Sequence, residues 1–158
     1  MKPIAALMAL SLFAATASVR AFDAPAGVES EFDPALAHKL GADERGMRHY
    51  VLVILKTGPH RMLDGEARKA MFAGHFANIG RLAKAGKLAL AGPFADDGSG
   101  WRGLFVFAVD SVDEAKKLAE TDPVIVNGEM VAEYHPWYGS AAVMQIPALH
   151  DKLVPPSK

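Results

Sequence analysis

The sequence lacks cysteine altogether over its 158 residues. Without cysteine the chain can form no disulfide, no thiol nucleophile and no cysteine-ligated metal site. The fold must therefore rest on its apolar core. An apolar fraction of 51% is enough for one ordinary domain with extensions.

An excess of positive charge is also missing, because 17 lysines and arginines stand against 18 acidic residues. A protein without that excess has no field with which to hold nucleic acid or an anionic membrane by charge alone. The motifs HExxH and GxSxG and the P-loop do not occur, and the histidines are scattered. We therefore expect no nucleic-acid partner and no metal site, and partners chosen by shape and local chemistry.

The N-terminal segment is typical of a secretory signal. Lys2 precedes an apolar run from Ile4 to Ala17, and small-residue cleavage patterns end at Ala17 and at Ala21. The run is shorter than the roughly 20 residues that a membrane-spanning helix needs. We therefore expect residues 1–21 to be a cleaved signal peptide, the mature protein to be periplasmic or secreted, and no stable membrane insertion after cleavage. An uncleaved anchor is the alternative.

Extensions flank the body of the chain on both sides. Residues 22–47 are predicted to form a linker with a short helix, for which Asp33, Pro34 and Gly41 supply the N-cap, the first residue and the stop. Residues 139–158 form a tail of mixed character that ends close to a pair of prolines.

The body of the chain alternates strand and helix signals. β-Branched and apolar runs bounded by glycine and proline predict strands over 49–58, 88–95, 101–110 and 129–138. Capping residues and apolar residues at helical spacing predict helices over 64–86 and 111–121, with a short turn at 122–128. This β-α-β-β-α-β order predicts a ferredoxin-like α+β fold, in which two helices cover one face of a four-stranded antiparallel sheet.

Both faces of the predicted sheet are apolar. In the first strand one face carries Tyr50, Leu52 and Ile54, and the other carries Val51, Val53 and Leu55. A sheet with one solvated face should alternate apolar and polar residues, so the second face must be covered. We predict a homodimer formed through this sheet face. The alternative cover is the C-terminal segment "AAVMQI" folding back.

The longest predicted helix carries a histidine on its apolar stripe. At helical spacing the stripe runs through Phe72, His75/Phe76, Ile79 and Leu82/Ala83. Gly74 and Gly80 lower the helix propensity beside this histidine by about 1 kcal/mol each. Glycine at these positions favours the close approach of another backbone or of a ligand.

A buried imidazole needs a partner for its ring nitrogens, and a carboxylate on one nitrogen fixes the tautomer and makes the other a better base. Asp122 is the best candidate for His75, because it ends the second helix, which lies beside the first on the same sheet face. Asp96 and Asp97 are weaker candidates in a loop. The alternative is a core histidine bonded to a backbone carbonyl, with Asp122 as an ordinary N-cap before proline.

Three further residues are candidates for ligand binding. Pro93 interrupts the second strand, where irregular backbone can open the mouth of a cavity. Tyr134 and Trp137 close the fourth strand on opposite faces, and packing or an interface is the alternative role for each. Trp101 and Arg102 are expected to make contacts at the rim only.

A combination of motifs marks the body of the chain: a histidine in the first helix, an "AGP" strand, a "DP" after the second helix and a closing aromatic strand. They lie in "YVLVILKTGP", "GHFANIGRLAKAGKLALAGPF", "GLFVFAVDSVDEAKKLAETDPVIVNG" and "VAEYHPWY". Over residues 48–138 the combination resembles the YciI-like (YCII-related) proteins of the dimeric α+β barrel superfamily. The resemblance implies a ferredoxin-like dimer, a pocket between helices and sheet, and a His–Asp pair at His75 and Asp122.

The resemblance also implies a kind of chemistry. Members with an assigned activity carry out lyase-like or proton-transfer steps on small, often aromatic, organic substrates. Some superfamily relatives bind haem through a histidine, but no feature of this sequence favours haem, and no cofactor is expected.

The sequence thus predicts an exported YciI-like protein that binds a small organic molecule beside His75. If it is an enzyme, His75 acts as general acid or base in a lyase-like or isomerase-like step, and Asp122 holds the ring. The alternative is a non-catalytic ligand-binding or interaction module, in which His75 is a structural or contact residue.

Overall fold

In the computed structural model, which describes residues 31–95 and 97–155, the apolar run at the start of the body forms strand β1 (Met47–Thr57). The other strands are β2 (Leu88–Pro93), β3 (Trp101–Phe107) and β4 (Met130–Ser140). The helices are α1 (Pro34–Leu40), α2 (Glu66–Lys84), α3 (Val112–Ala119), α4 (Pro123–Val126) and α5 (Ile146–Leu153), and the 3-10 helix η1 (Ala141–Gln145) precedes α5. These elements belong to one unit, Asp33–Lys158. The predicted signal peptide lies outside the described residues, as does the first part of the predicted linker.

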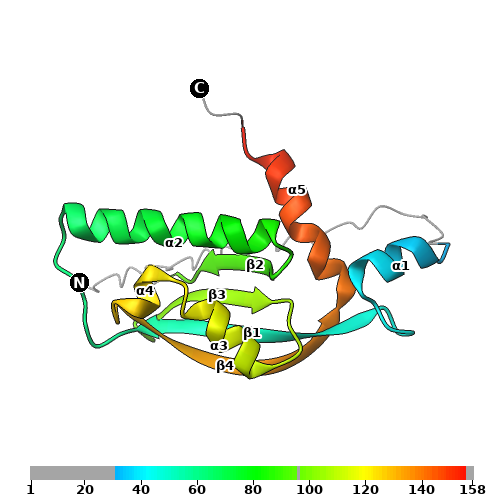
Figure 1. Ribbon diagram of the computed structural model, residues 1–158, viewed down its shortest axis with the longest axis horizontal. Helices are drawn as coiled ribbons and strands as arrows, with labels where there is room; N and C mark the ends of the chain where they lie inside the picture. The colour runs from blue at the N-terminus through cyan, green and yellow to red at the C-terminus, as the bar shows by residue number, and fades with distance from the viewer. Residues whose placement is uncertain (1–30, 96, 156–158) are drawn as a thin grey trace, which may run out of the picture. The chain divides into compact units, whose positions relative to one another are not determined.

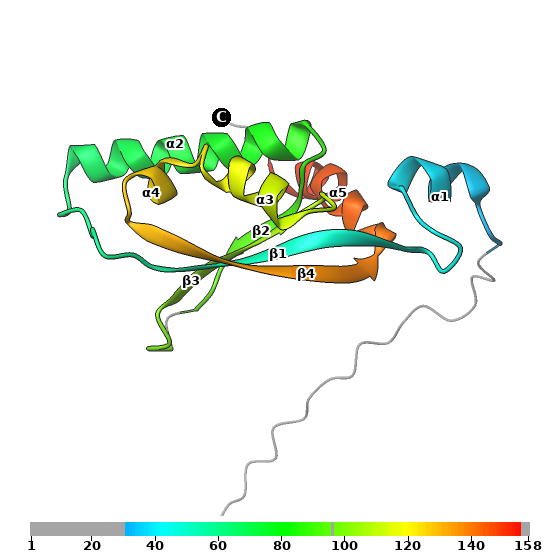
Figure 2. The ribbon, with the colours of Figure 1, turned by 60° about the horizontal axis from the view of Figure 1, so that its bottom comes forward.

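The strands form one antiparallel sheet in the order β2-β3-β1-β4 (Figure 1). β2 and β3 form a hairpin, and β1 lies between β3 and β4. Helices α2, α3 and α4 lie on one side of this sheet (Figure 2). The predicted ferredoxin-like α+β fold is therefore confirmed.

Local capping explains where the helices over the sheet begin. The Ser111 hydroxyl accepts a hydrogen bond from the Glu114 amide at 3.2 Å and so starts α3. The Asp122 carboxylate accepts one from the Val124 amide at 3.1 Å and so starts α4. Both caps are expected from the sequence. As the N-cap of α4, Asp122 is fully buried beneath the helices.

The start of α2 differs from its prediction. The helix begins at Glu66, and no side chain caps it. The Asp64 carboxylate instead pairs with Arg68, one turn along, at 3.2 Å. An acidic residue near a helix N-terminus does not have to cap it when a cation within the first turns competes for its oxygens.

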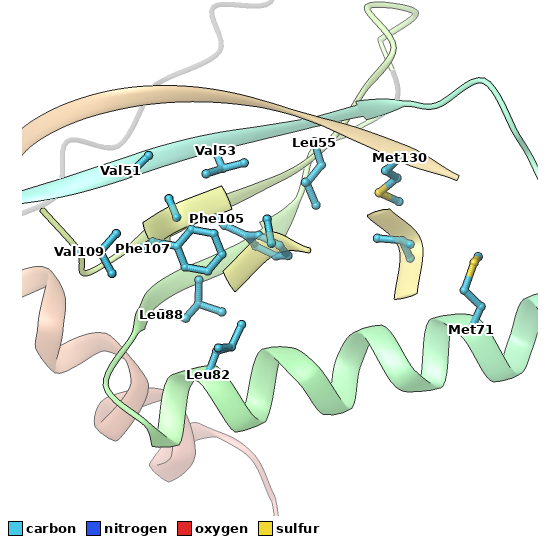
Figure 3. Close-up of a cluster of buried hydrophobic side chains, with 13 residues drawn as sticks. Val51, Val53, Leu55, Met71, Leu82, Leu88, Phe105, Phe107, Val109 and Met130 are labelled. Carbon is cyan, nitrogen blue, oxygen red and sulfur yellow. The ribbon is translucent and has the colours of Figure 1, made fainter. Parts of the chain in front are cut away.

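The main core fills the space between the sheet and these helices (Figure 3). It contains the predicted inward face of β1, namely Val51, Val53 and Leu55, together with Phe105, Phe107 and Val109 from β3 and the segment after it, and Met71 and Leu82 from α2. Removing a large apolar side chain of this kind from water contributes about 1.5–3 kcal/mol. This packing fixes α2 over the sheet and thereby the position of its histidine.

The opposite face of the sheet is partly covered by the tail. A smaller cluster of Tyr50, Ala89, Val106 and Ala108 is packed against by Val143 and Met144 of η1. Elsewhere on that face the Glu133 carboxylate contacts Lys56, and it lies 2.9 Å from His135 Nε2. The tail thus covers part of this apolar sheet face, and polar side chains occupy another part of the same face.

The C-terminal extension is more regular than the sequence suggests. β4 continues to Ser140, beyond its expected end at Tyr138, and η1 and α5 follow it without a break. No helix in the described part of the chain is both long and apolar enough to cross a membrane.

Candidate functional site

One stripe of α2 is buried, and it contains polar residues. Met71, His75, Asn78 and Leu82 follow the i, i+4, i+7, i+11 spacing of a helix face. Phe76, predicted on this stripe, is 65% exposed, so that part of the prediction is wrong. One helical step of about 100° separates Phe76 from His75, so Phe76 lies at the margin of the buried stripe, largely exposed but still in contact with the imidazole.

His75 and Asp122 form a buried pair. The Nδ1 atom of His75 lies 2.9 Å from both carboxylate oxygens of Asp122. Asp122 is 0% exposed and His75 is 7% exposed. Because a carboxylate accepts hydrogen bonds, Nδ1 donates, and in the neutral ring the lone pair is then on Nε2. Among the residues that the structure describes, none forms a hydrogen bond with Nε2.

A second layer of hydrogen bonds holds the Asp122 carboxylate in place. Asn78 donates to it from Nδ2 at 3.3 Å, in addition to the Val124 amide. The Asn78 carbonyl oxygen in turn accepts from Arg81 Nη2 at 2.6 Å and from the Thr121 hydroxyl at 3.2 Å. Several donors therefore compensate the buried negative charge.

Sequence reasoning did not identify Asn78 as part of this site. The available signal was its position three residues after His75, which places both side chains on one helix face. A polar residue at such a position needs partners when it is buried, and the Asp122 carboxylate and the Thr121 hydroxyl provide them.

Aromatic rings surround the imidazole on its other sides. The Phe105 ring is stacked on it, with centroids 5.9 Å apart and planes at 28°. The centroid of the Phe76 ring lies 5.3 Å from that of the imidazole, and the centroid of the Phe72 ring, which is nearly perpendicular to it, lies at 6.0 Å. Contacts with aromatic rings of this kind help to hold the orientation of the imidazole.

The imidazole lines a cavity of about 350 Å³ between α2 and the β2, β3 and β1 strands. Its walls are mainly apolar and aromatic. Among the described residues that line it, His75 and Arg102 alone carry ionisable side chains. The volume lies in the range typical of small-molecule sites, which are apolar with a few placed polar groups.

The structure brings one of the predicted ligand-binding residues to the histidine. Pro93, at the end of β2, lines the cavity together with His75. Tyr134 faces the same side of the sheet but packs into the main core. Trp137 lies on the opposite face, where its ring is 5.3 Å from that of Tyr50. Neither Tyr134 nor Trp137 lines this cavity, whereas Arg102, expected only at the rim, does.

A second buried carboxylate lies near the start of α2. Glu129 is 0% exposed and accepts hydrogen bonds from Arg68 Nη2 and from the Met62 amide, each at 2.7 Å. Burial by itself raises the pKa of Glu129, but these donors outweigh it and leave that pKa below its ordinary value. Through these two hydrogen bonds Glu129 connects the start of β4 to the loop before α2 and to α2 itself, which is a structural role.

The described residues contain no group of three or more histidine, cysteine, aspartate or glutamate side chains that could hold a metal ion. The site therefore consists of an acid–base pair, aromatic walls and one cation. Such a set can bind an organic molecule and move a proton.

Comparison with known proteins identifies relatives of the body of the chain. The family model described as "YCII-related domain" matches residues 48–138, more than half of the chain. Among solved structures, 5-chloro-2-hydroxyhydroquinone dehydrochlorinase (TftG) from Burkholderia phenoliruptrix AC1100, in complex with 2,5-dihydroxybenzoquinone, is similar at 23% identity and a TM-score of 0.40. That match covers 55% of this chain and 92% of the other. No curated protein sequence matches this chain.

Proposed function

The chain belongs to the YCII-related domain family, and we propose that it binds a small organic molecule in the cavity beside His75 and transfers a proton there. The reaction would be lyase-like or isomerase-like. One observation carries the proposal: a histidine whose Nδ1 is bonded to a buried carboxylate lines an apolar cavity with its ring. A fixed tautomer with an unbonded Nε2 is what a general base requires.

In this mechanism Nε2 of His75 removes a proton from a substrate carbon or hydroxyl group. The electron pair left behind forms a new double bond as a leaving group departs, or shifts within the substrate. The imidazolium then returns the proton to the leaving group or to another substrate atom. Asp122 keeps the ring in place and stabilises the imidazolium, as a carboxylate does for a catalytic histidine. Asp122 is a positioning residue, because it lies behind the ring.

Proton transfer can be tested before the substrate is identified. The protein is incubated in D₂O with a panel of cyclic ketones, lactones and phenols, and deuterium uptake at carbon is measured by mass spectrometry. We expect the wild-type protein to exchange at least one class. His75→Gln should reduce the rate by about 10²-fold or more. His38→Gln, the same change at an exposed position on α1, should leave it unaltered. Full exchange by His75→Gln would refute the assignment.

The second candidate function is a non-catalytic binding module. It is favoured by the double role of Asp122, which caps α4 as well as contacting His75. In that case ligands bind the cavity but no compound of the panel exchanges, and His75→Gln changes affinity or thermal stability only.

Two further parts of the proposal concern the setting of the site. We propose that residues 1–21 are a signal peptide that directs the protein to the periplasm or out of the cell. The support is the charge and apolar pattern of that segment. Mass spectrometry of the protein recovered outside the cytoplasm should find an N-terminus just after Ala17 or Ala21.

We also propose a homodimer formed through the open sheet face. Its support is the incomplete cover of that face, where Trp137 remains 37% exposed. The test of this proposal is the mass of the protein in solution.

A further inference from the structure

Arg102 stands at an irregularity of the sheet. The pairing of β1 with β3 shifts between Leu55 and Lys56: Leu55 lies opposite Gly103, whereas Lys56 lies opposite Trp101. Arg102 is thus the extra residue of a β-bulge. Bulges re-aim side chains next to functional sites. Here the residue in the bulge lines the cavity that also contains His75.

The guanidinium of Arg102 has no hydrogen bond and no ion pair with any residue that the structure describes. The other partly buried arginines have partners: Arg68 binds Glu129, and Arg48 donates a hydrogen bond to the Leu40 carbonyl oxygen. Glu129 acts on Arg102 only at longer range, and its carboxylate is already bound by Arg68. Arg102, a half-buried residue beside an apolar cavity, thus has its guanidinium available for an anionic ligand.

A neighbouring groove extends the positive charge outward. This groove, of about 420 Å³, is lined by Arg102 and Arg61 together with the rings of Phe94 and Trp101. Arg61 is exposed and likewise has no ion pair with a described residue. Because Arg102 lines both the cavity and the groove, the groove brings a second positive charge, that of Arg61, to the same side of the cavity. Positive charges along an entrance raise the local concentration of anionic ligands.

We propose that the cavity binds a monocyclic organic acid whose carboxylate is held by Arg102. Guanidinium and carboxylate match as planar forks with two parallel hydrogen bonds. The ring of the acid would lie among Phe72, Phe76 and Phe105, and a proton of the acid would face His75. This substrate class rests on the proposed function for its relation to His75, but the preference for the acid over its amide depends on Arg102 and does not require His75.

Paired probes of equal shape test the charge requirement. Benzoate, 2-hydroxybenzoate and cyclohexanecarboxylate are compared with the corresponding amides by NMR titration of the full protein. We expect at least one acid to bind about tenfold or more tighter than its amide, as for hydrogen bonds to a charged group. Arg102→Gln should bring the two affinities to within about twofold of each other. Arg45→Gln, which removes the same charge from an exposed position outside the cavity, should keep the wild-type ratio.

The outcomes separate this proposal from proton transfer. Equal affinity of the wild-type protein for acid and amide would overturn it, as would failure of every acid to bind or an unchanged preference in Arg102→Gln. Thermal unfolding of Arg102→Gln verifies that the variant is folded, and Arg102→Lys should recover part of the preference. If His75→Gln still prefers the acid while no compound exchanges deuterium, the anion site stands and the proton-transfer function fails.

Discussion

Gly74 of α2 lies directly against the ring of Pro123, the first residue of α4. A Cβ atom at position 74 would come within 3.0 Å of Pro123 Cγ, whereas a Cβ at Gly80 would meet no atom within 4 Å. Pro123 follows Asp122, so the missing side chain at position 74 lets α4 approach far enough for the Asp122 carboxylate to reach His75. One of the two glycines thus has the packing role that the sequence suggested for both.

This contrast predicts different effects for the same substitution. Gly80→Ala should stabilise the protein by about 0.5–1 kcal/mol, because alanine is the better helix former and nothing obstructs its methyl group. Gly74→Ala gains the same propensity but must displace Pro123. We expect no net stabilisation from it, and slower deuterium exchange if the proposed function holds. Urea denaturation of both variants measures the difference; equal stabilisation by the two would contradict the packing role of Gly74.

Asp122 combines two roles that different substitutions separate. Asn is as good an N-cap as Asp, so Asp122→Asn should keep α4 and most of the stability. Its amide can donate to His75, which lets the ring take the Nε2–H tautomer. Asp122→Ala loses the cap, worth about 1 kcal/mol. It also leaves the buried donors of His75 and Asn78 unpaired, which should destabilise the fold by about 1–3 kcal/mol for each donor.

The tautomer is the decisive measurement for that pair of variants. Nitrogen-15 NMR of the imidazole should show the proton on Nδ1 in the wild-type protein. In Asp122→Asn at neutral pH the proton is expected on Nε2, together with a large loss of exchange activity and a smaller loss of stability than in Asp122→Ala, because the cap is kept while the hydrogen bond from Asn78 is lost. A wild-type ring protonated on Nε2 alone would show that the carboxylate does not control the tautomer.

The fold and the His75–Asp122 contact could be predicted because their signals are local. The Asp-Pro cap, the Ser111 cap and the period-2 alternation of β1 each depend on neighbouring residues. Once the strand and helix order specifies the topology, Asp122 lies on the helix layer beside α2.

The remaining features of the site depend on register and packing that no short window contains. Arg102 reaches the cavity because of a one-residue shift between two strands distant in sequence. The exposure of Phe76 depends on how α2 is rotated about its axis. That rotation decides whether His75 or Phe76 is the more buried of the two neighbours. Tyr134 and Trp137 are aromatic at the expected place, but the cavity opens at the other edge of the sheet, near β2.

Glu129 predicts a pH dependence of stability. Its pKa in the folded protein lies below the ordinary value of 4.5, with the opposing burial effect outweighed by hydrogen bonds from Arg68 and Met62. A depressed carboxyl pKa stabilises the fold at pH values above the unfolded pKa, and this contribution is lost as the pH falls through the folded pKa. The free energy of unfolding should therefore decrease on acidification below about pH 4.5.

The substitution Glu129→Gln should remove that part of the pH dependence. It leaves Arg68 without its buried counter-ion, so we expect a loss of about 3 kcal/mol at pH 7. Glu66→Gln, in an exposed pair with Lys69, should change stability by no more than about 0.5 kcal/mol. Urea denaturation between pH 3 and pH 7 compares the three proteins, and an identical acid-induced loss in Glu129→Gln would assign the effect to other carboxylates.

The open sheet face predicts the state of association. Leu52 lies at its centre, opposite Val106 on β3 and His135 on β4. If two copies pack through this face, Leu52→Lys places a charge of each copy in an apolar interface near its symmetry mate. Light scattering should then give a dimer mass for the wild-type protein and a monomer mass for Leu52→Lys. Circular dichroism should show the same secondary structure in both. Ala77→Lys, an exposed change on α2, should remain dimeric. A monomeric wild-type protein would instead mean that η1 and the polar groups around Glu133 are sufficient cover for this face.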